Sequence, residues 1–545
     1  MVESYFAQPS VMTAQQHFSQ VPAAEIQRSR FDRSHAVKTT FDAGLLIPIF
    51  LDEVLPGDTF TLNTTAFARL ATPLKPVMDN MYLDIHYFFV PNRLVFDLWP
   101  EFMGERPTPN FDPNTVVPPY MPWVPGSEPS TSDTVGKYFG LPPVHNPNPG
   151  PPEQVSCLPF RAYALIYNEW YRDQNLVEPI AFHTGSYDPA FDFDFTPRRR
   201  GKRHDYFTSC LPWPQKGDPV MVPIGGDAQV YGYNNSALSP FVLAGTNTSV
   251  NLLGQNAVTG SVDYSSASSF PSTTPGLRLG NNPLNPIGYA DLAGATAVSV
   301  NDLRTAFQIQ KLLERDARGG TRYIELILSH FGVRSDDARL QRPEYLGGGT
   351  QRVNVNPVAS TVAETTVPQA NLAGVGTVVT RGGFQKSFTE HGLIIGLASV
   401  RADLTYQRSL DRMWSRKSRY DYYWPSLAHL GEQAVLNKEI YFTGVESVDN
   451  SVFGYQERFA EYRYKPSLVT GKFNSYAQGS LDVWHLAQDF SDVPALNNLF
   501  IREDPPVDRV IAVPSEPHFL ADFWHDLKCD RPMPVYSVPG LIDHF

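Results

Sequence analysis

The sequence predicts a mainly β protein, a Greek-key or jelly-roll sandwich of antiparallel strands with long loops and a few short helices. Strand-like segments begin near residue 41 and return after residue 349. Long excursions separate them, which suits a sandwich better than alternating βαβ units. The chain also contains 48 prolines and 38 glycines in 545 residues, too many for a largely helical protein. Surface loops must therefore hold much of the chain.

The first strands are expected between residues 41 and 90. Met81–Val90 alternates two sets of side chains and stops at Pro91, which predicts a long, half-buried strand. Before it, residues 55–58 (LPGD) give a turn signal followed by strand-like residues 59–62, with the spacing of a hairpin. Residues 106–154 are crowded with prolines, so this segment must lie along a surface.

Three isolated helices are expected between the strands and loops. The first is Phe160–Arg172, where an aromatic stripe that includes Tyr163 and Trp170 recurs at helical spacing and faces a core. The second is Asn301–Arg318, with Leu303, Phe307 and Leu313 directed inward. The third is Arg322–Phe331, capped by Thr321 and ended by Gly332.

The last part of the chain returns to strand-like sequence. Gly392–Val400 predicts a buried strand or loop and no membrane insertion, because it has less than half of the roughly 20 residues needed to cross a bilayer. Further strand-like segments are Lys438–Phe442, Val452–Arg463 and Gly479–His485.

Composition divides the chain into four parts. Residues 1–40 are polar and predict an N-terminal arm, and residues 41–220 hold the first strands with long proline-rich loops. Residues 221–299 predict a surface insertion, because they are mostly small and polar and have too little apolar surface for a core of their own. Residues 300–545 supply the helical pair, the remaining strands and an extended C-terminal segment.

The balance of charged and aromatic residues indicates a subunit of an assembly. Only 18% of the residues are charged, against about 25% in average soluble chains, while 12% are aromatic. Such a surface suits a protein that neighbouring subunits cover. The net charge of −12 argues against a protein whose whole surface binds nucleic acid, although a local basic patch is compatible with it.

Three cysteines are too few and too widely spaced to predict a disulfide framework or a zinc site. Cys157, Cys210 and Cys529 form no C-x-x-C pair, so a reducing cytoplasm is expected. The first basic residue is Arg28, and no long apolar run precedes it, which does not support a secretory signal.

The sequence contains no catalytic signature such as G-x-S-x-G or H-E-x-x-H, so we expect no enzyme and no cofactor. His525 and Cys529 are two possible metal ligands, but two ligands do not make a site. Asp192 and Asp194 share one side of a predicted strand and are interpreted as a solvated face. Trp424, Trp484 and Trp524 are interpreted as anchors of the core or of an interface rather than as platforms on which bases stack.

Two basic segments are the candidates for contact with nucleic acid. One contains Arg28, Arg30 and Arg33, and the other contains Arg198, Arg199, Arg200, Lys202 and Arg203. Phosphates would offset the repulsion within the second segment, and neighbouring aromatic residues could stack bases. Ion pairs to carboxylates across a subunit contact would offset it equally well, and the sequence does not decide between the two.

Several segments resemble the major capsid proteins of the microviruses, Microviridae, in particular the gokushovirus branch. They include residues 31–35 (FDRSH), 87–94 (YFFVPNRL), 167–173 (YNEWYRD), 199–217 (RRGKRHDYFTSCLPWPQKG), 330–333 (HFGV), 342–348 (RPEYLGG) and 539–545 (PGLIDHF). The resemblance covers nearly the whole chain except residues 221–299.

The resemblance implies an eight-stranded jelly roll of the viral capsid type. It implies pentamers that assemble into a T=1 icosahedral shell around circular single-stranded DNA, together with a small basic DNA-associated protein. It further implies that the insertion forms a protrusion near the three-fold axes and contacts a host surface receptor. The protein is then expected in the virion, assembled in the cytoplasm of a host bacterium.

Two other classes of protein remain open. A carbohydrate-active or carbohydrate-binding β-sandwich would account for the abundant aromatic residues and the paired carboxylates, but it would be expected to carry a signal peptide. A sequence-specific DNA-binding protein would need a reader helix and a basic domain.

Overall fold

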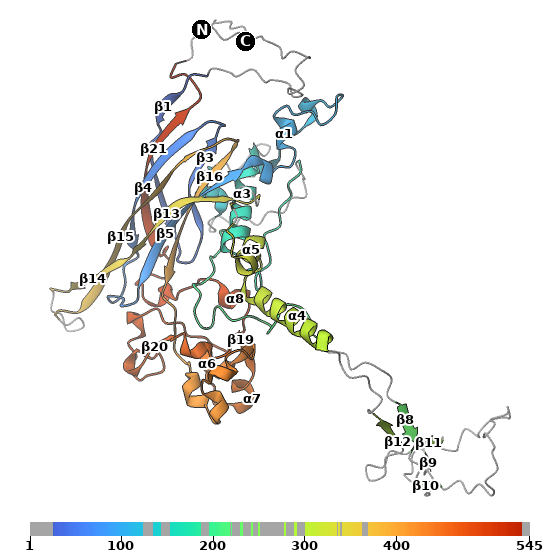
Figure 1. Cartoon of the computed structure of the whole chain (residues 1–545). Coiled ribbons are helices and arrows are strands. Elements are labelled where there is room, and N and C mark those ends of the chain that lie inside the picture. Colours follow the sequence, from blue (N-terminus) through green and yellow to red (C-terminus); the bar gives the residue numbers. More distant parts are fainter. Residues whose placement is uncertain are drawn as a thin grey trace. The chain divides into compact units, whose positions relative to one another are not determined.

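The computed structural model describes residues 26–123, 134–142, 153–186, 196–218, 220, 229–232, 241–243, 249–250, 277–279, 288–291, 300–334, 336–337, 341–361 and 369–536. Two antiparallel sheets form the centre of the main body (Figure 1). The protein is therefore mainly β and forms a β-sandwich, as the sequence predicts.

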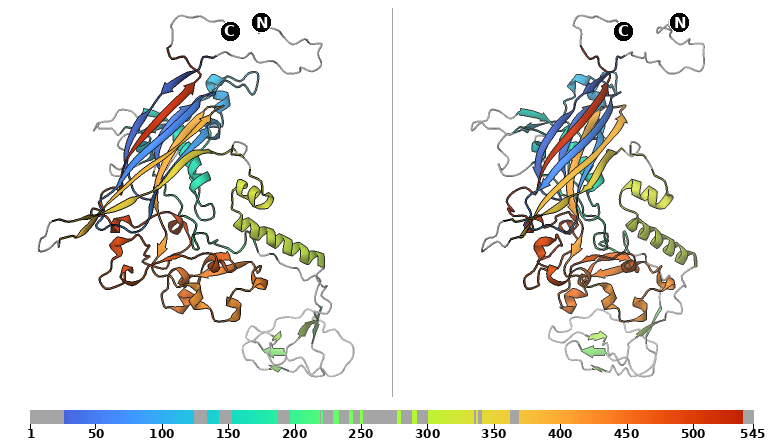
Figure 2. Two further views of the ribbon diagram at one scale, coloured as in Figure 1. Left: turned by 60° about the vertical axis from the view of Figure 1, so that its left-hand side comes forward. Right: turned by 90° about the vertical axis from the view of Figure 1, so that its left-hand side faces the viewer.

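The larger sheet joins the two ends of the chain. Its strands are β1 (Ser29–Asp32), β2 (His35–Phe41), β4 (Thr59–Leu70), β14 (Asn354–Ala359), β15 (Leu372–Ser387) and β21 (Phe519–Arg531). The order is β1-β21-β4-β15-β14, and β2 also pairs with β21. Figure 2 shows the red C-terminal strand between blue N-terminal strands. Part of the expected arm, residues 29–40, is thus strand held in the sheet by β21.

The smaller sheet has the order β13-β5-β16-β3. Its strands are β3 (Ile47–Val54), β5 (Met81–Pro91), β13 (Glu344–Arg352) and β16 (Gly392–Ala402). The predicted strands Met81–Val90 and Gly392–Val400 are confirmed, and they pair with each other along their whole length.

The core lies between the two sheets. β21 alternates buried and more exposed side chains, so one face of the larger sheet is covered and the other is open. The covered side chains include Phe60, Leu62, Phe519, Phe523 and Leu527 of the larger sheet and Leu83, Ile85, Ile394 and Ala398 of the smaller one. Each fully buried phenylalanine or leucine contributes about 1.5–3 kcal/mol.

Unlike the larger sheet, the smaller sheet is buried on both faces along its central strands β5 and β16. Along β5, Tyr82 and His86 are the side chains that keep partial exposure, so the predicted half-buried pattern is wrong. The second face is covered by α3 (Leu158–Ile166) and the π-helical turn η3 (Tyr167–Tyr171), with Phe88 packing on Trp170. A helix distant in sequence covers this face, which the alternation within the strand alone cannot reveal.

The turn at residues 55–58 does not form the predicted hairpin. It connects β3 to β4, and these strands belong to different sheets. Gly57 has φ +89°, and the buried Asp58 carboxylate accepts a hydrogen bond from the Leu55 N–H at 2.9 Å. The predicted turn is thus present, but the sequence of a turn does not determine whether the two strands beside it pair with each other.

All three predicted helices exist, with differences at their ends. They are α3, which continues as η3, α4 (Val300–Arg318) and α5 (Tyr323–Phe331). Thr321 does not cap α5. Instead Glu325 accepts hydrogen bonds from the N–H groups of Thr321 and Arg322, both at 3.0 Å. Leu303 and Phe307 of α4 are exposed rather than inward, because no apolar cluster of the described residues includes them.

Two of the late strand predictions are wrong. Lys438–Phe442 overlaps helix α6 (Asn437–Ile440), because the Glu439 carboxylate accepts from the Leu436 N–H and starts a helical turn. Gly479–His485 contains the 3-10 turn η10 (Asp482–Trp484). Val452–Arg463 does begin as strand β19 (Val452–Glu457), which pairs with β18 (Glu432–Leu436).

The chain divides into two compact units, Gln215–Arg315 and the rest. Most of the predicted insertion lies outside the described residues, so its boundaries and its exposure stay predictions. The short strands described within it are β8 (Gln229–Gly232), β9 (Phe241–Leu243), β10 (Ser249–Val250), β11 (Leu277–Leu279) and β12 (Gly288–Asp291).

The remaining described elements are short. They are α1 (Trp99–Phe102), β6 (Tyr120–Trp123), α2 (Val135–Tyr138), β7 (Glu153–Ser156), β17 (Thr405–Tyr406), α7 (Glu446–Asp449), β20 (Ser467–Leu468) and α8 (Asn498–Ile501). No helix in the described ranges is long and apolar enough to cross a membrane.

Candidate nucleic-acid interface

The basic segment Arg198–Arg203 is held by backbone hydrogen bonds to two neighbouring segments. The Leu46 N–H donates to the Arg198 carbonyl at 2.8 Å, and the Arg200 N–H donates to the Gly44 carbonyl at 2.9 Å. On the other side, the Lys202 N–H donates to the Ile501 carbonyl at 2.7 Å. These bonds fix the direction in which each basic side chain leaves the backbone.

Arg200 points into the protein, where it shares a carboxylate with a second arginine. Asp84 is 3% exposed, and its Oδ2 accepts from Arg200 and from Arg401, each at 2.6 Å. Its Oδ1 accepts from the Thr350 hydroxyl at 2.7 Å. Burial alone would raise the pKa of Asp84, but the hydrogen bonds and the two positive charges lower it. This cluster ties the basic segment to β5, β13 and β16.

Lys202 is also directed inward. Its side chain is buried, with the ammonium group 2.8 Å from Gln488 Oε1 and 4.5 Å from the centre of the Phe500 ring. Burial lowers the pKa of Lys202 to about 8. The group is thus a structural cation in the single chain.

The other cations of this segment are closer to solvent. Arg199 forms an ion pair with Asp504 at 2.9 Å, and Arg203 pairs with Asp403 at 3.5 Å. The carboxylate partners of Arg199, Arg200 and Arg203 therefore belong to the same chain rather than to a neighbouring subunit.

Arg28, Arg30 and Arg33 lie on or just before β1 and β2, separate from the second basic segment. Arg30 pairs with Asp530 at 2.7 Å, and Arg33 pairs with Asp52. Arg28 is exposed and donates to the Thr59 hydroxyl at 3.4 Å. The two basic segments thus occupy different elements and are not brought together by a hydrogen bond or ion pair recorded among the described residues.

The other residues noted in the sequence have structural environments. His525 lies on β21 with no exposed surface, bonded to the Thr64 hydroxyl at 2.8 Å and the Ile49 carbonyl at 3.0 Å. The described residues contain no group of three or more His, Cys, Asp or Glu that could hold a metal ion. The three cysteines are free and buried. Asp192 and Asp194 lie outside the described residues.

Trp424 and Trp524 are not core residues. Half of each side chain is exposed in the single chain, so neither fits the interpretation as a core anchor. Trp484 is partly buried.

A surface that the sequence reasoning missed combines arginines with tyrosines. We call it the arginine–tyrosine surface, and it consists of Arg416, Lys417, Arg419, Tyr420, Tyr422, Tyr423, Trp424, Arg458 and Tyr462. The Arg416 guanidinium lies 4.4 Å from the Tyr462 ring centre and 5.2 Å from that of Tyr422. Arg458 donates to the Tyr420 carbonyl at 3.2 Å. The sequence signal was visible as residues 416–424 (RKSRYDYYW).

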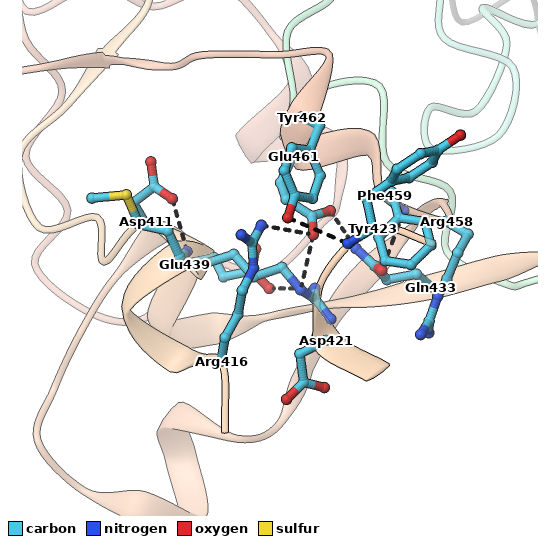
Figure 3. A network of polar contacts seen from close by, with 12 residues as sticks. Asp411, Arg416, Asp421, Tyr423, Gln433, Glu439, Arg458, Phe459, Glu461 and Tyr462 are labelled. Atoms are coloured by element: carbon cyan, nitrogen blue, oxygen red, sulfur yellow. Dashed lines mark hydrogen bonds and ion pairs between the residues drawn. The ribbon is translucent and has the colours of Figure 1, made fainter. Parts of the chain in front are cut away.

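A buried polar network supports this surface (Figure 3). Glu461 accepts from Gln433 at 2.8 Å and lies 3.5 Å from Arg416. Glu439 accepts from Arg412 at 2.9 Å and from the Tyr206 hydroxyl at 2.8 Å. Burial raises the pKa of Glu439 despite the nearby Arg412 charge. The network holds Arg416 through Glu461, and the Arg416 guanidinium in turn lies against the Tyr422 and Tyr462 rings.

The fold and these surfaces define a structural class of protein. Several cations of the two basic segments serve ion pairs within the chain, and large aromatic side chains are left uncovered, as in a subunit made to be covered by partners. The chain belongs to the family described as capsid protein (F protein), whose model matches residues 19–541.

Three curated relatives are similar in sequence to this chain along nearly their whole lengths. The chain is 44% identical to capsid protein VP1 of Chlamydia phage 1, with 98% of each chain covered. It is 44% identical to capsid protein VP1 of Bdellovibrio phage phiMH2K, covering 97% of this chain and 98% of the relative. Capsid protein VP1 of Spiroplasma virus 4 is 36% identical over 98% of this chain and 99% of the relative.

These relatives are gokushovirus-type members of Microviridae, so the predicted resemblance is confirmed. The chain is a structural, non-enzymatic component of a virion that assembles with copies of itself into a capsid. The carbohydrate-active alternative finds no support.

Proposed function

We propose that this chain is the major subunit of a T=1 icosahedral shell, built through pentamers around circular single-stranded DNA in the cytoplasm of a host bacterium. The observation that carries the proposal is the family match over residues 19–541, which leaves no large part of the chain for another activity. Wide, complementary faces then hold the subunits together, because a closed shell needs contacts much larger than those of a transient complex.

We further infer an eight-stranded jelly roll inside the sandwich. Leaving out the short strands β1 and β14, each sheet has four strands, in the orders β2-β21-β4-β15 and β3-β16-β5-β13. The first strand pairs with the last, and consecutive strands β3 and β4 belong to opposite sheets. Both features are expected of a jelly roll, in which a long antiparallel hairpin folds over so that its strands form two packed sheets.

The open face of the larger sheet supports subunit contact. Phe67, Val379, Leu520 and Trp524 lie on this face with 39–56% of each side chain exposed. They come from adjacent strands, with Phe67 opposite Val379 in the register and Leu520 opposite Arg69. Several large apolar side chains exposed on one face suit a surface that a neighbouring subunit covers.

Contact with DNA is proposed for only part of the predicted set. Arg200 is bound to a buried carboxylate and Lys202 is itself buried, which leaves Arg28, Arg30, Arg33, Arg198, Arg199 and Arg203 as candidates. Because the chain carries a net charge of −12, other cations must neutralise most of the phosphate, and a small basic phage protein would supply them. Outward exposure of residues 221–299 and their contact with a host receptor are also proposed.

The test is the oligomeric state. The purified chain, produced with its phage partners, is expected to elute as discrete pentamers or very large particles and to show spherical shells in electron micrographs. A chain that stays monomeric at high concentration and never forms shells would overturn the proposal.

A further inference from the structure

The arginine–tyrosine surface exposes aromatic rings. Tyr420, Tyr422, Tyr423, Trp424 and Tyr462 are each 50–53% exposed. They are held in place rather than loose, because the Trp424 indole N–H donates to the Arg419 carbonyl at 2.8 Å and Tyr423 packs edge-on to Phe459 at 5.3 Å. The positions of the rings are therefore set before any partner arrives.

The same surface carries positive charge without carboxylate partners. Lys417, Arg419 and Arg458 form no ion pair with any described residue. Asp421 is the single acid of residues 416–424, and its carboxylate accepts instead from the N–H groups of Lys417 and Ser418 at 2.9 and 2.7 Å. Arg416 differs, since it forms an ion pair with Glu461 at 3.5 Å. Three cations thus remain available to an external anion.

Cations and ring faces also lie within reach of each other. The Arg419 guanidinium is 4.8 Å from the ring centre of the exposed Tyr420, while Arg458 is held 4.8 Å from the ring centre of Phe459, which is itself buried. A single-stranded nucleic acid is complementary to this surface. Its phosphates can pair with the cations, and its unpaired bases can stack on the aromatic rings.

The composition of the surface favours a nucleic acid over a protein partner. Residues 416–424 contain no aliphatic side chain, and they include an exposed lysine. Protein interfaces are also rich in tyrosine, tryptophan and arginine, but their centres are depleted in charge, whereas this surface holds three cations that have no carboxylate partner among the described residues. Duplex DNA fits less well, because its bases are already stacked on one another.

We propose that the arginine–tyrosine surface binds single-stranded DNA, with bases stacked on the exposed rings and phosphates held by Lys417, Arg419 and Arg458. This proposal rests on the proposed packaging of a single-stranded genome. It adds a site distinct from the two basic segments, which lie on other elements.

The first experiment removes the cations. Binding of a fluorescein-labelled oligothymidylate to the purified full-length chain is measured by anisotropy for wild type and for K417A/R419A/R458A. The variant is expected to bind at least tenfold more weakly, and the slope of log affinity against log salt should fall by about 2, since each phosphate contact on a single strand contributes about 0.7. The control K75A/K386A/K438A removes the same charge elsewhere and should leave affinity within about threefold of wild type.

The second experiment separates stacking from charge. Y420A/Y422A/W424A is expected to weaken binding at least tenfold, while Y420F/Y422F/W424F keeps the ring faces and should stay within about threefold of wild type. Wild type should prefer the oligothymidylate to a duplex of the same length. Unchanged affinity in the cation and alanine variants, or equal affinity for the duplex, would overturn the proposal.

Shell assembly is followed in parallel by electron microscopy. Normal shells with reduced DNA binding support the proposal. Variants that lose shells but bind oligothymidylate like wild type would identify a contact between subunits and overturn it. Failure of wild type itself to form shells would instead count against the proposed capsid function, so the two failures are distinguishable.

Discussion

At the scale of single residues, buried charge does more to hold this subunit together than to bind ligands. Asp84 brings together Arg200 and Arg401, which approach β5 from distant parts of the chain. Removing one member of a buried ion pair leaves the other charge without compensation, at a cost of about 3–5 kcal/mol. The sequence of the basic segment therefore predicts a ligand site, although one of its arginines, Arg200, stabilises the fold through its ion pair with Asp84.

Asp84→Asn tests this role. The variant leaves two partly buried arginines without their shared anion and is expected to lower the free energy of unfolding by about 3 kcal/mol. Asp522→Asn is the matched control, because Asp522 pairs with Lys38 at 3.3 Å with both groups well exposed, and such pairs contribute about 1 kcal/mol or less. Urea denaturation of the unassembled chain measures both, and equal losses would contradict the assignment.

His525 makes folding sensitive to acid. Burial lowers its pKa to about 4 in the folded chain, against about 6.5 when unfolded, so the folded state resists protonation. The contribution is fully present above pH 6.5 and is lost as pH falls towards 4, amounting to about 3 kcal/mol. Unfolding free energies measured between these pH values should decline, and His525→Gln should flatten the decline. The exposed His429, replaced by Gln, should leave it unchanged.

At the scale of elements, the two sheets differ in what covers them. The smaller sheet is closed on its outer side by α3 and η3, whereas the outer side of the larger sheet keeps Phe67, Leu520 and Trp524 exposed. Within the single chain, the outer face of the smaller sheet is thus covered, whereas the outer face of the larger sheet is exposed.

Trp524→Ala is expected to separate folding from assembly. The side chain is 51% exposed, so its loss should change the free energy of unfolding by less than about 1 kcal/mol. If a neighbouring subunit covers the open face, shell formation should require a several-fold higher protein concentration, measured by light scattering. Lys528→Ala on the same strand is the control. Unchanged assembly of the tryptophan variant would show that this face stays open in the shell.

At the scale of the whole molecule, the sequence predicted patterns that a single segment contains. Alternation along β5, the apolar run of β16 and the helical stripes of α3 to α5 depend on nearby residues, so their type could be inferred. Pairing across the chain could not be inferred, so the spacing around residues 55–58 predicts a hairpin that the fold does not contain. The site predictions met the same limit, since the partners Asp84 and Gln488 of the basic segment lie far away in sequence.

The predicted insertion can be tested by a deletion that the structure suggests. The Lys216 N–H bonds to the Leu313 carbonyl at 3.4 Å, and Gln310 donates to the Gln215 side chain, so the chain leaves and returns at neighbouring points. Replacing residues 217–312 with a short glycine linker therefore joins backbone that is already close. Because the two sheets and their core contain none of these residues, shells are expected to assemble. Adsorption to host cells, measured by depletion of particles from the medium, should be lost, whereas normal adsorption would show that the receptor contact lies elsewhere.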